Sequence, residues 1–573
     1  MKRLVAVFAV LLLLGAASAA IGILLARGGA PAAALGSPTL LVWRIDRPIV
    51  EWTPVVGLPF AGAEDPDTMK ELYRAFLRAR DDESVAGLAV YLQNASFGLA
   101  KAQELRRQMQ RLSEAGKPVD CYLETAGEGS NGTLAYYLAT ACDSISIAPG
   151  GDVNLLGLYA DSTFYSGTLE KLKIEPQYSH VGRFKSAGET FTRRQRGPDT
   201  DAAIAAVLDS DFRQIVEAIA ETRGLEPARV RELVDGAPWS PEEATAHGLI
   251  DHVEYPDQFR DRVEAGIEDE PRLVALSDYR GTSGRGGGDR IAVVYALGTI
   301  VRGTGGVQPF TEEVYLGSDE LAEMLRALRE DDSVDAVVLR VDSPGGSALA
   351  SDLMLREVEL TAAAKPLVVS MSDLAASGGY YIAARASRIV AEPATLTGSI
   401  GVVGGKLMTR RFQDEVLGIT HDTDQRGANA DLYSSLAPFS PEQAVKVRRE
   451  MERVYRDFVA HVAAGRGLDP AAVEEVAQGR VWTGEDAHAR GLVDELGGID
   501  RAVELAKELA GIDGDAPVRL VFYPEQPTLL DLLLERRPPA LPSSLARLVQ
   551  AVERPNPGLL ELPPEYAGLA SPF

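Results

Sequence analysis

Hydrophobic and polar positions follow the same order twice along the chain. From Asp67 and again from Ser318, apolar residues recur at helical spacing, which predicts an amphipathic helix. In both places an acidic turn and a short apolar strand follow, and later strands read VVLRV from Val337 and LVVSM from Leu367. Strands with so few polar positions are typical of parallel sheets that helices cover on both faces. The sequence therefore predicts an α/β fold.

The repetition extends to the residues themselves. The run KPVDCYLETAGEGSNGTLAYYLATACDSISIAPGG from Lys117 answers KPLVVSMSDLAASGGYYIAARASRIVAEPATLTGS from Lys365. A tryptophan turn also recurs, as GAPWSPEEATAHGLID from Gly236 and GRVWTGEDAHARGLVD from Gly479. Similarity over such a length indicates a tandem duplication of one α/β unit.

Each tryptophan turn predicts a short, capped helix. Ser240 and Thr483 are placed to cap its first turn, because a hydroxyl accepts the free N–H groups there. Gly248 and Gly491 are placed to end it, since glycine tolerates the left-handed conformation that often follows a helix.

These patterns divide the chain into five segments. The predicted order is a membrane anchor or signal sequence at 1–30, a first α/β repeat at 38–276, a linker rich in Gly and Ser at 277–290, a second α/β repeat at 291–515 and a proline-rich tail at 516–573.

The N-terminus has the pattern of a membrane anchor. Lys2 and Arg3 precede an uncharged stretch from Leu4 to Ala26, which reaches the roughly 20 residues that a spanning helix needs. The basic residues lie mainly before the stretch, so the N-terminus is expected in the cytoplasm and the body outside it. We therefore expect a single-pass protein of the bacterial inner membrane with its body on the periplasmic side. Cleavage at the small-residue run AASAA is the alternative.

Charge and cysteine content narrow the function classes. The 573 residues carry a formal net charge of −25 without a prominent basic patch, which argues against nucleic acid as a partner. The two cysteines, Cys121 and Cys142, are interpreted as small buried hydrophobes, with a disulfide as the alternative in an oxidising compartment. No spacing of Cys and His indicates zinc, so no metal is expected.

Ser377 has the position of a nucleophile. It lies between a predicted strand and a predicted helix, where free N–H groups favour developing negative charge. Gly378 allows a substrate carbonyl to approach closely, and a second glycine turn with Gly345 and Gly346 would supply another N–H donor. Taken alone, a Ser-Gly-Gly turn is more often an ordinary helix cap.

The two copies have lost complementary residues. The serine position is Thr133 in the first copy, whereas Lys185 of the first copy is matched by Ala430 in the second. None of the six histidines lies in a catalytic motif, and Ser377 lacks the G-x-S-x-G setting of a Ser-His-Asp enzyme. A Ser-His-Asp triad is therefore the minority option, and Lys185 is the stronger candidate base, provided that burial lowers its pKa from about 10.4 toward neutrality. A lone lysine is otherwise most often a solvated surface group.

Several strings together resemble peptidase family S49, in its long, duplicated signal peptide peptidase form. They are FKSAGETF, SPGGS, AASGGYYIA, TLTGSIGV and GRVWTGEDAHARGLVD. The resemblance implies a crotonase/Clp-protease-like unit in each half and a Ser/Lys dyad of Ser377 and Lys185. It also implies that Ser399 orients the lysine. Gly188 and Thr190 depart from the bulkier residues typical of the family, which affects the expected pocket shape more than the chemistry.

The resemblance also implies substrates and assembly. The expected protein is a membrane-bound serine endopeptidase that degrades cleaved signal peptides, and other unfolded or hydrophobic peptides, through an acyl-enzyme. It would need no cofactor and would form a bowl-shaped homotetramer facing the membrane. Another acyl hydrolase of the same fold and a non-catalytic membrane scaffold are the alternatives. Whether Lys185 meets Ser377 within one subunit or between subunits stays open at this level.

Overall fold

The computed structural model describes residues 38–52, 66–93, 96–281, 288–307, 313–514 and 516–524. The predicted anchor at 1–30, part of the linker and most of the tail lie outside these ranges. Within them, no helix combines the length and the apolar character that crossing a membrane requires.

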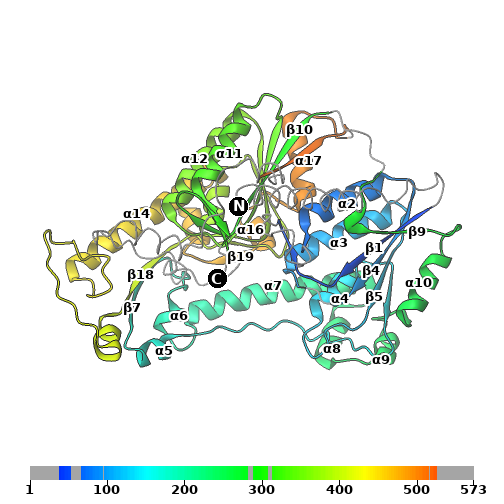
Figure 1. Ribbon diagram of the computed structural model, residues 1–573, viewed down its shortest axis with the longest axis horizontal. Helices are drawn as coiled ribbons and strands as arrows, with labels where there is room; N and C mark the ends of the chain where they lie inside the picture. The colour runs from blue at the N-terminus through cyan, green and yellow to red at the C-terminus, as the bar shows by residue number, and fades with distance from the viewer. Residues whose placement is uncertain are drawn as a thin grey trace, which may run out of the picture.

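The first repeat forms a parallel six-stranded sheet, on the right in Figure 1. Its strands, in spatial order, are β8 (His252–Val253), β6 (Ser144–Ile147), β5 (Val119–Leu123), β4 (Val85–Leu92), β1 (Thr39–Ile45) and β9 (Arg272–Ala275). Nearly every residue of β4 is buried, as expected for a central parallel strand covered on both faces.

The second repeat rebuilds this sheet in the same order. Its strands are β20 (Glu495–Leu496), β16 (Arg388–Ala391), β15 (Leu367–Ala376), β14 (Ala336–Ser343), β10 (Arg290–Leu297) and β21 (Arg519–Tyr523), all parallel. The far end of β15 also pairs with β17 (Leu396–Gly398), which in turn pairs with β19 (Val481–Thr483). The predicted α/β fold and its duplication are thus confirmed. The sheet extends past residue 515, because β21 uses residues that the sequence analysis assigned to the tail.

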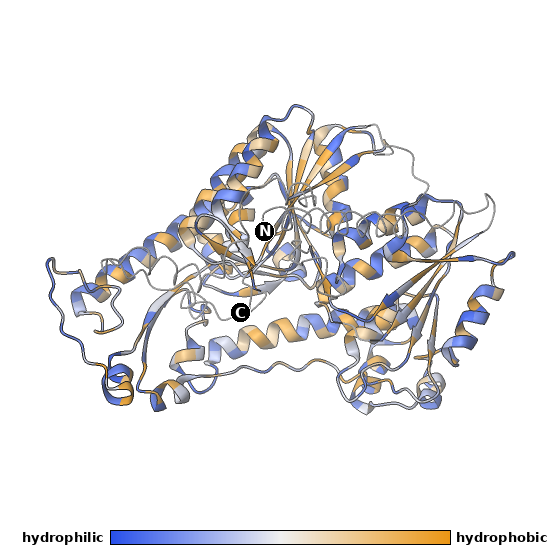
Figure 2. Cartoon of the chain, in the orientation of Figure 1, coloured by the Kyte–Doolittle hydropathy of each residue, from blue (hydrophilic) through white to orange (hydrophobic). Residues whose placement is uncertain are grey.

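Helices occur in both repeats, and most of them pack on the two sheets. Those of the first repeat are α2 (Met69–Asp81), α3 (Leu99–Glu114), α4 (Thr133–Ala139), α5 (Ser166–Lys171), α6 (Glu189–Thr192), α7 (Pro198–Arg223), α8 (Pro227–Gly236), α9 (Pro241–Ala246), α10 (Pro256–Ala265) and the 3-10 helix η1 (Leu276–Asp278). Those of the second are α11 (Ser318–Glu330), α12 (Ala348–Ala364), α13 (Gly378–Ala383), the π-helix η2 (Phe412–Leu417), α14 (Pro441–Arg466), α15 (Pro470–Val476), α16 (Gly484–Ala489) and α17 (Ile499–Ala510). Figure 2 shows hydrophobic residues concentrated on the strands of both sheets.

The capped helices of the tryptophan turns form as predicted. The side chain of Ser240 accepts the Glu243 N–H at the start of α9, and that of Thr483 accepts the Asp486 N–H at the start of α16. Gly491 adopts a φ of 72° just after α16, which is a left-handed conformation that suits glycine.

The part of the first repeat from the extended segment before α5 to α7 forms an arm that reaches the second repeat. In Figure 1 the extended segment runs along the lower edge, away from its own sheet, and α7 leads back. At the far end of the arm, β7 (Glu175–Val181) pairs antiparallel with β18 (Val402–Met408) of the second repeat. Two smaller sheets complete the fold: β2 (Ile49–Val50) with β3 (Asp67–Thr68), and β11 (Thr299–Val301), β13 (Val314–Gly317) and β12 (Gly306–Val307).

The two repeats also share buried contacts. Tyr73 of α2 belongs to a hydrophobic cluster formed by strands of the second sheet and by α17. Beside it, Arg107 of α3 pairs with Glu392 and Asp500 of the second repeat. Both carboxylates are almost completely buried, so solvent screens them weakly, whereas the Arg107 side chain is partly exposed.

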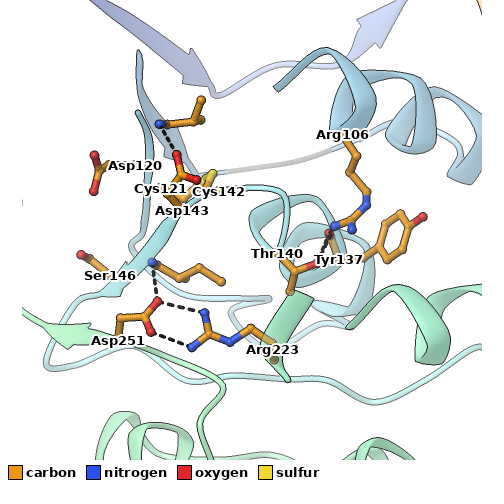
Figure 3. The surroundings of a disulfide bond; sticks show 12 residues. Arg106, Asp120, Cys121, Tyr137, Thr140, Cys142, Asp143, Ser146, Arg223 and Asp251 are labelled. Carbon is orange, nitrogen blue, oxygen red and sulfur yellow. Dashed lines mark hydrogen bonds and ion pairs between the residues drawn. A yellow bond between two sulfur atoms is a disulfide. The ribbon is translucent and has the colours of Figure 1, made fainter. Parts of the chain in front are cut away.

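The two cysteines are joined. Cys121 and Cys142 are buried, as the sequence indicated, but the favoured interpretation without a bond is corrected, because the structure links them by a disulfide with Cα atoms 5.8 Å apart. Figure 3 shows the bond between β5 and the turn after α4. In the same turn the carboxylate of Asp143 accepts the Val119 N–H at 2.8 Å. The pairing was not predictable from spacing, since it depends on two segments meeting in the folded sheet.

Candidate active site

Ser377 lies on a sharp turn between β15 and α13. Its backbone has φ 53° and ψ −116°, a conformation that costs energy for a residue with a side chain. The neighbouring strand holds it there, because the Ser377 N–H donates to the carbonyl of Gly398 at 2.9 Å. The turn places the serine directly before the first residues of α13, whose N–H groups have no partner within the helix.

Lys185 arrives from the other repeat, at the end of the arm. After β7 the chain turns at Gly182, with φ 107°, and the Phe184 N–H donates to the carbonyl of Gln478 at 2.7 Å. Gly479 then lies against the lysine backbone, so that a Cβ on this glycine would fall 2.6 Å from Lys185 Cβ. A side chain at position 479 would displace the lysine.

The structure brings Lys185, Ser377 and Ser399 together within one chain. The Nζ of Lys185 lies 3.0 Å from Ser377 Oγ, 2.8 Å from Ser399 Oγ and 2.9 Å from the Ser399 carbonyl oxygen. Ser399 is itself fixed, since its N–H donates to the carbonyl of Arg480 at 2.7 Å.

The surroundings favour an uncharged amine. Lys185 is only 7% exposed, and burial lowers its pKa to about 7, because an ammonium ion loses more hydration than a neutral amine on leaving water. Near neutral pH a large fraction of the amine is therefore free to accept a proton.

The second glycine turn lies against the serine turn. A Cβ on Gly345 would fall 2.4 Å from the nitrogen of Gly378, and one on Gly378 would fall 3.1 Å from the nitrogen of Gly346. Gly345 and Gly346 have φ values of 96° and 154°, which favour glycine. The N–H of Gly345 donates to the hydroxyl of Ser343 at 3.1 Å. The three predicted oxyanion glycines thus lie together, and the N–H group of Gly345 already has a partner in Ser343.

The equivalent place in the first repeat lacks this chemistry. Thr133 is 1% exposed, and its hydroxyl accepts the Gly157 N–H at 2.9 Å. Leu155 occupies the position of Ser399 and is fully buried, while Ala430, the counterpart of Lys185, is exposed.

The sequence analysis missed the residues that hold the lysine. Gln478, Gly479 and Arg480 contact Lys185, its neighbour Phe184 and Ser399 through backbone atoms. The residue that could have indicated this contact is Gly479, which precedes Arg480 in the GRVW of the second tryptophan turn. The sequence does not show that Gly479 lies against Lys185, because the two residues are far apart in the chain.

A family model described as peptidase family S49 matches residues 111–268 and 359–513. The chain is 34% identical over 507 residues to the chloroplastic serine protease SPPA of Arabidopsis thaliana, covering 86% of this chain and 72% of that one. It is 32% identical over 505 residues to Protease 4 of Salmonella typhi, covering 85% and 78%. A putative signal peptide peptidase SppA of Enterococcus faecium is 33% identical over 224 residues, covering 39% and 64%.

Solved structures were matched as well. A ClpP1 variant from Listeria monocytogenes aligns with 37% of this chain and 92% of its own, at 13% identity and a TM-score of 0.23. A variant of the 1510-N membrane-bound stomatin-specific protease aligns with 41% and 97%, at 15% identity and a TM-score of 0.25.

The family assignment rests on the extent of these sequence matches. The two matched segments of the family model fall in the two repeats, and the long relatives align with most of the chain at more than 30% identity. The chain belongs to peptidase family S49 and is a serine protease.

Proposed function

We propose that the protein is a membrane-anchored endopeptidase in which Ser377 is the nucleophile and Lys185 the general base. The observation that carries this proposal is the 3.0 Å contact between Ser377 Oγ and a buried lysine amine whose pKa is about 7. A lysine of ordinary pKa would be protonated near neutrality and would not accept the serine proton.

The three contacts of Nζ match the bonding capacity of a neutral amine. Its two N–H groups donate to the carbonyl and the hydroxyl oxygen of Ser399. In the proposed neutral state this leaves its lone pair to accept a hydrogen bond from the Ser377 O–H, whose oxygen lies 3.0 Å away. These contacts support the orienting role of Ser399 that the family resemblance implies.

The reaction follows from this arrangement. The oxygen of Ser377 attacks the peptide carbonyl while its proton passes to Nζ, which gives a tetrahedral oxyanion and an ammonium group. The ammonium returns the proton to the leaving amine as the C–N bond breaks, leaving an acyl-enzyme. Water then attacks the ester, Lys185 takes its proton, and the serine leaves with that proton restored.

We assign the oxyanion contacts to the N–H groups of Gly346 and Gly378. Both nitrogens lie at the junction of the two glycine turns beside Ser377. The N–H of Gly345 already donates to Ser343, and its part is to shape the turn. Preorganised backbone donors of this kind contribute about 3 kcal/mol to lowering the barrier.

The proposed substrates are signal peptides and other hydrophobic or unfolded peptides. The name of the Enterococcus faecium relative supports this class. We also propose a homotetramer, in which other copies cover exposed apolar side chains of the arm, among them Leu156, Tyr159 and Tyr165, which are 46%, 86% and 48% exposed.

A location outside the cytoplasm is part of the proposal. The Cys121–Cys142 disulfide supports it, because such bonds persist mainly in oxidising compartments. The charge pattern around the apolar N-terminal stretch supports the same orientation.

The decisive experiment uses a fluorophosphonate probe and a defined signal peptide. Wild type should be labelled and should cleave the peptide internally, as read by mass spectrometry of the products. Ser377→Ala and Lys185→Ala should each lose both activities while keeping the assembly size of wild type. Retained cleavage in either variant would refute the dyad, and an unlabelled, inactive wild type would favour the scaffold alternative.

A further inference from the structure

A second lysine of the first repeat, Lys101, is buried against the catalytic strands of the second. It lies in the first turn of α3 and is 7% exposed. Its Nζ lies 2.7 Å from Asp342 Oδ2 and 2.6 Å from Asp373 Oδ2. Both carboxylates belong to the second repeat, so one cation of the first half joins two anions of the other.

The two carboxylates lie where β14 and β15 depart from regular pairing. The register between the two strands shifts between Val341 and Ser343. At this irregularity Asp342 Oδ1 accepts the Leu374 N–H at 3.2 Å. Asp373 Oδ1 accepts the backbone N–H of Lys101 at 3.0 Å, which caps α3 from the other repeat.

Both strands lead directly into the proposed site. Asp342 precedes Ser343, whose hydroxyl accepts the Gly345 N–H at 3.1 Å and donates to the Gly298 carbonyl at 2.7 Å. Leu374 begins the last stretch of β15 before Ser377. The bridge through Lys101 therefore connects the end of β14 before the glycine turn with the end of β15 before the serine turn.

A second cation near the bridge, Arg340, is already engaged with other carboxylates. On β14, Arg340 forms ion pairs with Glu51, 2.9 Å away, and with Glu104 of α3, 3.0 Å away. Glu51 adds a further carboxylate 3.9 Å from Lys101 Nζ. Burial raises the pKa of Asp342 to about 6 even though Lys101 opposes the change. Without the lysine, the neighbouring carboxylates of Glu51, Asp342 and Asp373 would repel one another, and Asp342 would bind a proton at higher pH.

We propose that Lys101 is a positioning residue that holds the glycine turn and the serine turn in reactive alignment. This inference rests on the proposed Ser/Lys mechanism. The first repeat then makes two contributions to the second repeat, the serine half that carries Ser377. Lys185 is the base, and Lys101 aligns the two turns. The serine half is competent only while α3 is docked on it.

The test compares Lys101→Met with a matched variant, Lys117→Met. Lys117 is a buried lysine of the same repeat, 8% exposed, whose Nζ donates to the carbonyls of Ala79 and Asp82 within that repeat. Lys101→Met should slow fluorophosphonate labelling of Ser377 and lower kcat/KM roughly 100-fold, the effect of a displacement of about 1 Å. Lys117→Met should stay within about threefold of wild type at a temperature where both variants are folded.

A charge-neutral rescue separates alignment from packing. Adding Asp342→Asn and Asp373→Asn to Lys101→Met removes the repulsion but keeps the oxygen atoms that accept N–H groups, so the labelling rate should recover about tenfold or more over Lys101→Met. If Lys101→Met does not fold, the triple variant with an activity within about tenfold of wild type supports the proposal. A triple variant no faster than Lys101→Met, or Lys101→Met equal to wild type, would overturn it.

The pH profile gives a second readout. In wild type, the labelling rate should first decline as Lys185 becomes protonated near pH 7. Protonation of Asp342 should make this decline steeper below about pH 6. In Lys101→Met the steep region should begin at higher pH, and in Lys101→Met with Asp342→Asn it should vanish. An unchanged slope in all three proteins would contradict the inference. Labelling that persists in Ser377→Ala would instead refute the proposed function itself.

Discussion

Gly479 and Lys185 come from different repeats, yet their backbones touch. A Cβ on Gly479 would lie 2.6 Å from both the nitrogen and the Cβ of Lys185, closer than real Cβ contacts come. Gly479 also has φ 75°, and its N–H donates to the Ile400 carbonyl at 2.7 Å, next to Ser399. The position of the proposed base therefore depends on the absence of a side chain in the second repeat.

The variant Gly479→Ala tests this dependence. The added methyl group should displace Lys185 and lower kcat/KM about 100-fold, because roughly 1 Å of misplacement is enough for such a loss. Gly467→Ala is the control: Gly467 has φ 64°, and its added methyl group would meet no neighbouring atom within 4 Å. It should cost about 1 kcal/mol of stability without changing kcat/KM. Equal activities for the two variants would contradict the proposed close approach.

The pKa of Lys185 predicts the pH dependence of catalysis. In the proposed mechanism the neutral amine takes the serine proton, so kcat/KM should rise through a midpoint near pH 7 and then level off. The profile is measured with a peptide substrate under first-order conditions. A midpoint near 10 would show that the amine is solvated and has its ordinary pKa.

The same pKa predicts a change in stability. Between about pH 7 and about 10.4 the unfolded chain holds more protons at this lysine than the folded protein, so the free energy of unfolding should rise with pH. Lys185→Met removes this dependence, and its gain in stability over wild type should shrink from pH 7 to pH 10. Denaturant titrations of both proteins measure the difference. A constant difference across this range would contradict the lowered pKa.

Ser399→Ala tests the orienting hydroxyl. The variant keeps the carbonyl contact to Nζ but loses the hydroxyl at 2.8 Å, so kcat should fall about 10- to 100-fold, part of the contribution of a positioned base. The pKa of Lys185 should fall further, since a polar partner of the ammonium form is lost. The pH midpoint of kcat should therefore move down.

Ser240→Ala is a suitable control for that experiment. Ser240 caps α9 in the first repeat, so its loss should cost about 1 kcal/mol of stability and leave kcat unchanged. A fall in kcat of the same size in both variants would mean that Ser399 acts through stability alone.

The disulfide predicts a redox-dependent stability. Cys121 and Cys142 are 21 residues apart, and closing a loop of that length contributes roughly 3 kcal/mol. Reduction, or replacement of both cysteines by alanine, should lower the free energy of unfolding by about this amount. Peptide cleavage well below the melting temperature should persist, because neither sulfur lies in the proposed site. Unchanged unfolding curves with and without reductant would show that the bond does not form in solution.

Local pattern was enough to predict the units of the fold. The apolar strands around Val337 and Leu367 form parallel strands, and Ser240 and Thr483 cap the helices they precede. Such features depend on neighbours a few residues away, so periodicity and capping chemistry reveal them. The comparison of the two copies, together with the resemblance to peptidase family S49, predicted Ser377 and Lys185 as the candidate residues that each half had kept.

The contacts that assemble the site were beyond the reach of local pattern. The pairing of β7 with β18 carries Lys185 to Ser377 within one chain, and no periodicity records which distant strands will pair. The bond between Cys121 and Cys142 and the bridge from Lys101 to Asp342 have the same origin. The sequence by itself determined the two α/β units, because these follow from local interactions, and it assigned the candidates Ser377 and Lys185 one to each unit. Only the tertiary structure decided how the units meet, because burial and charge pairing depend on residues hundreds of positions apart in the chain.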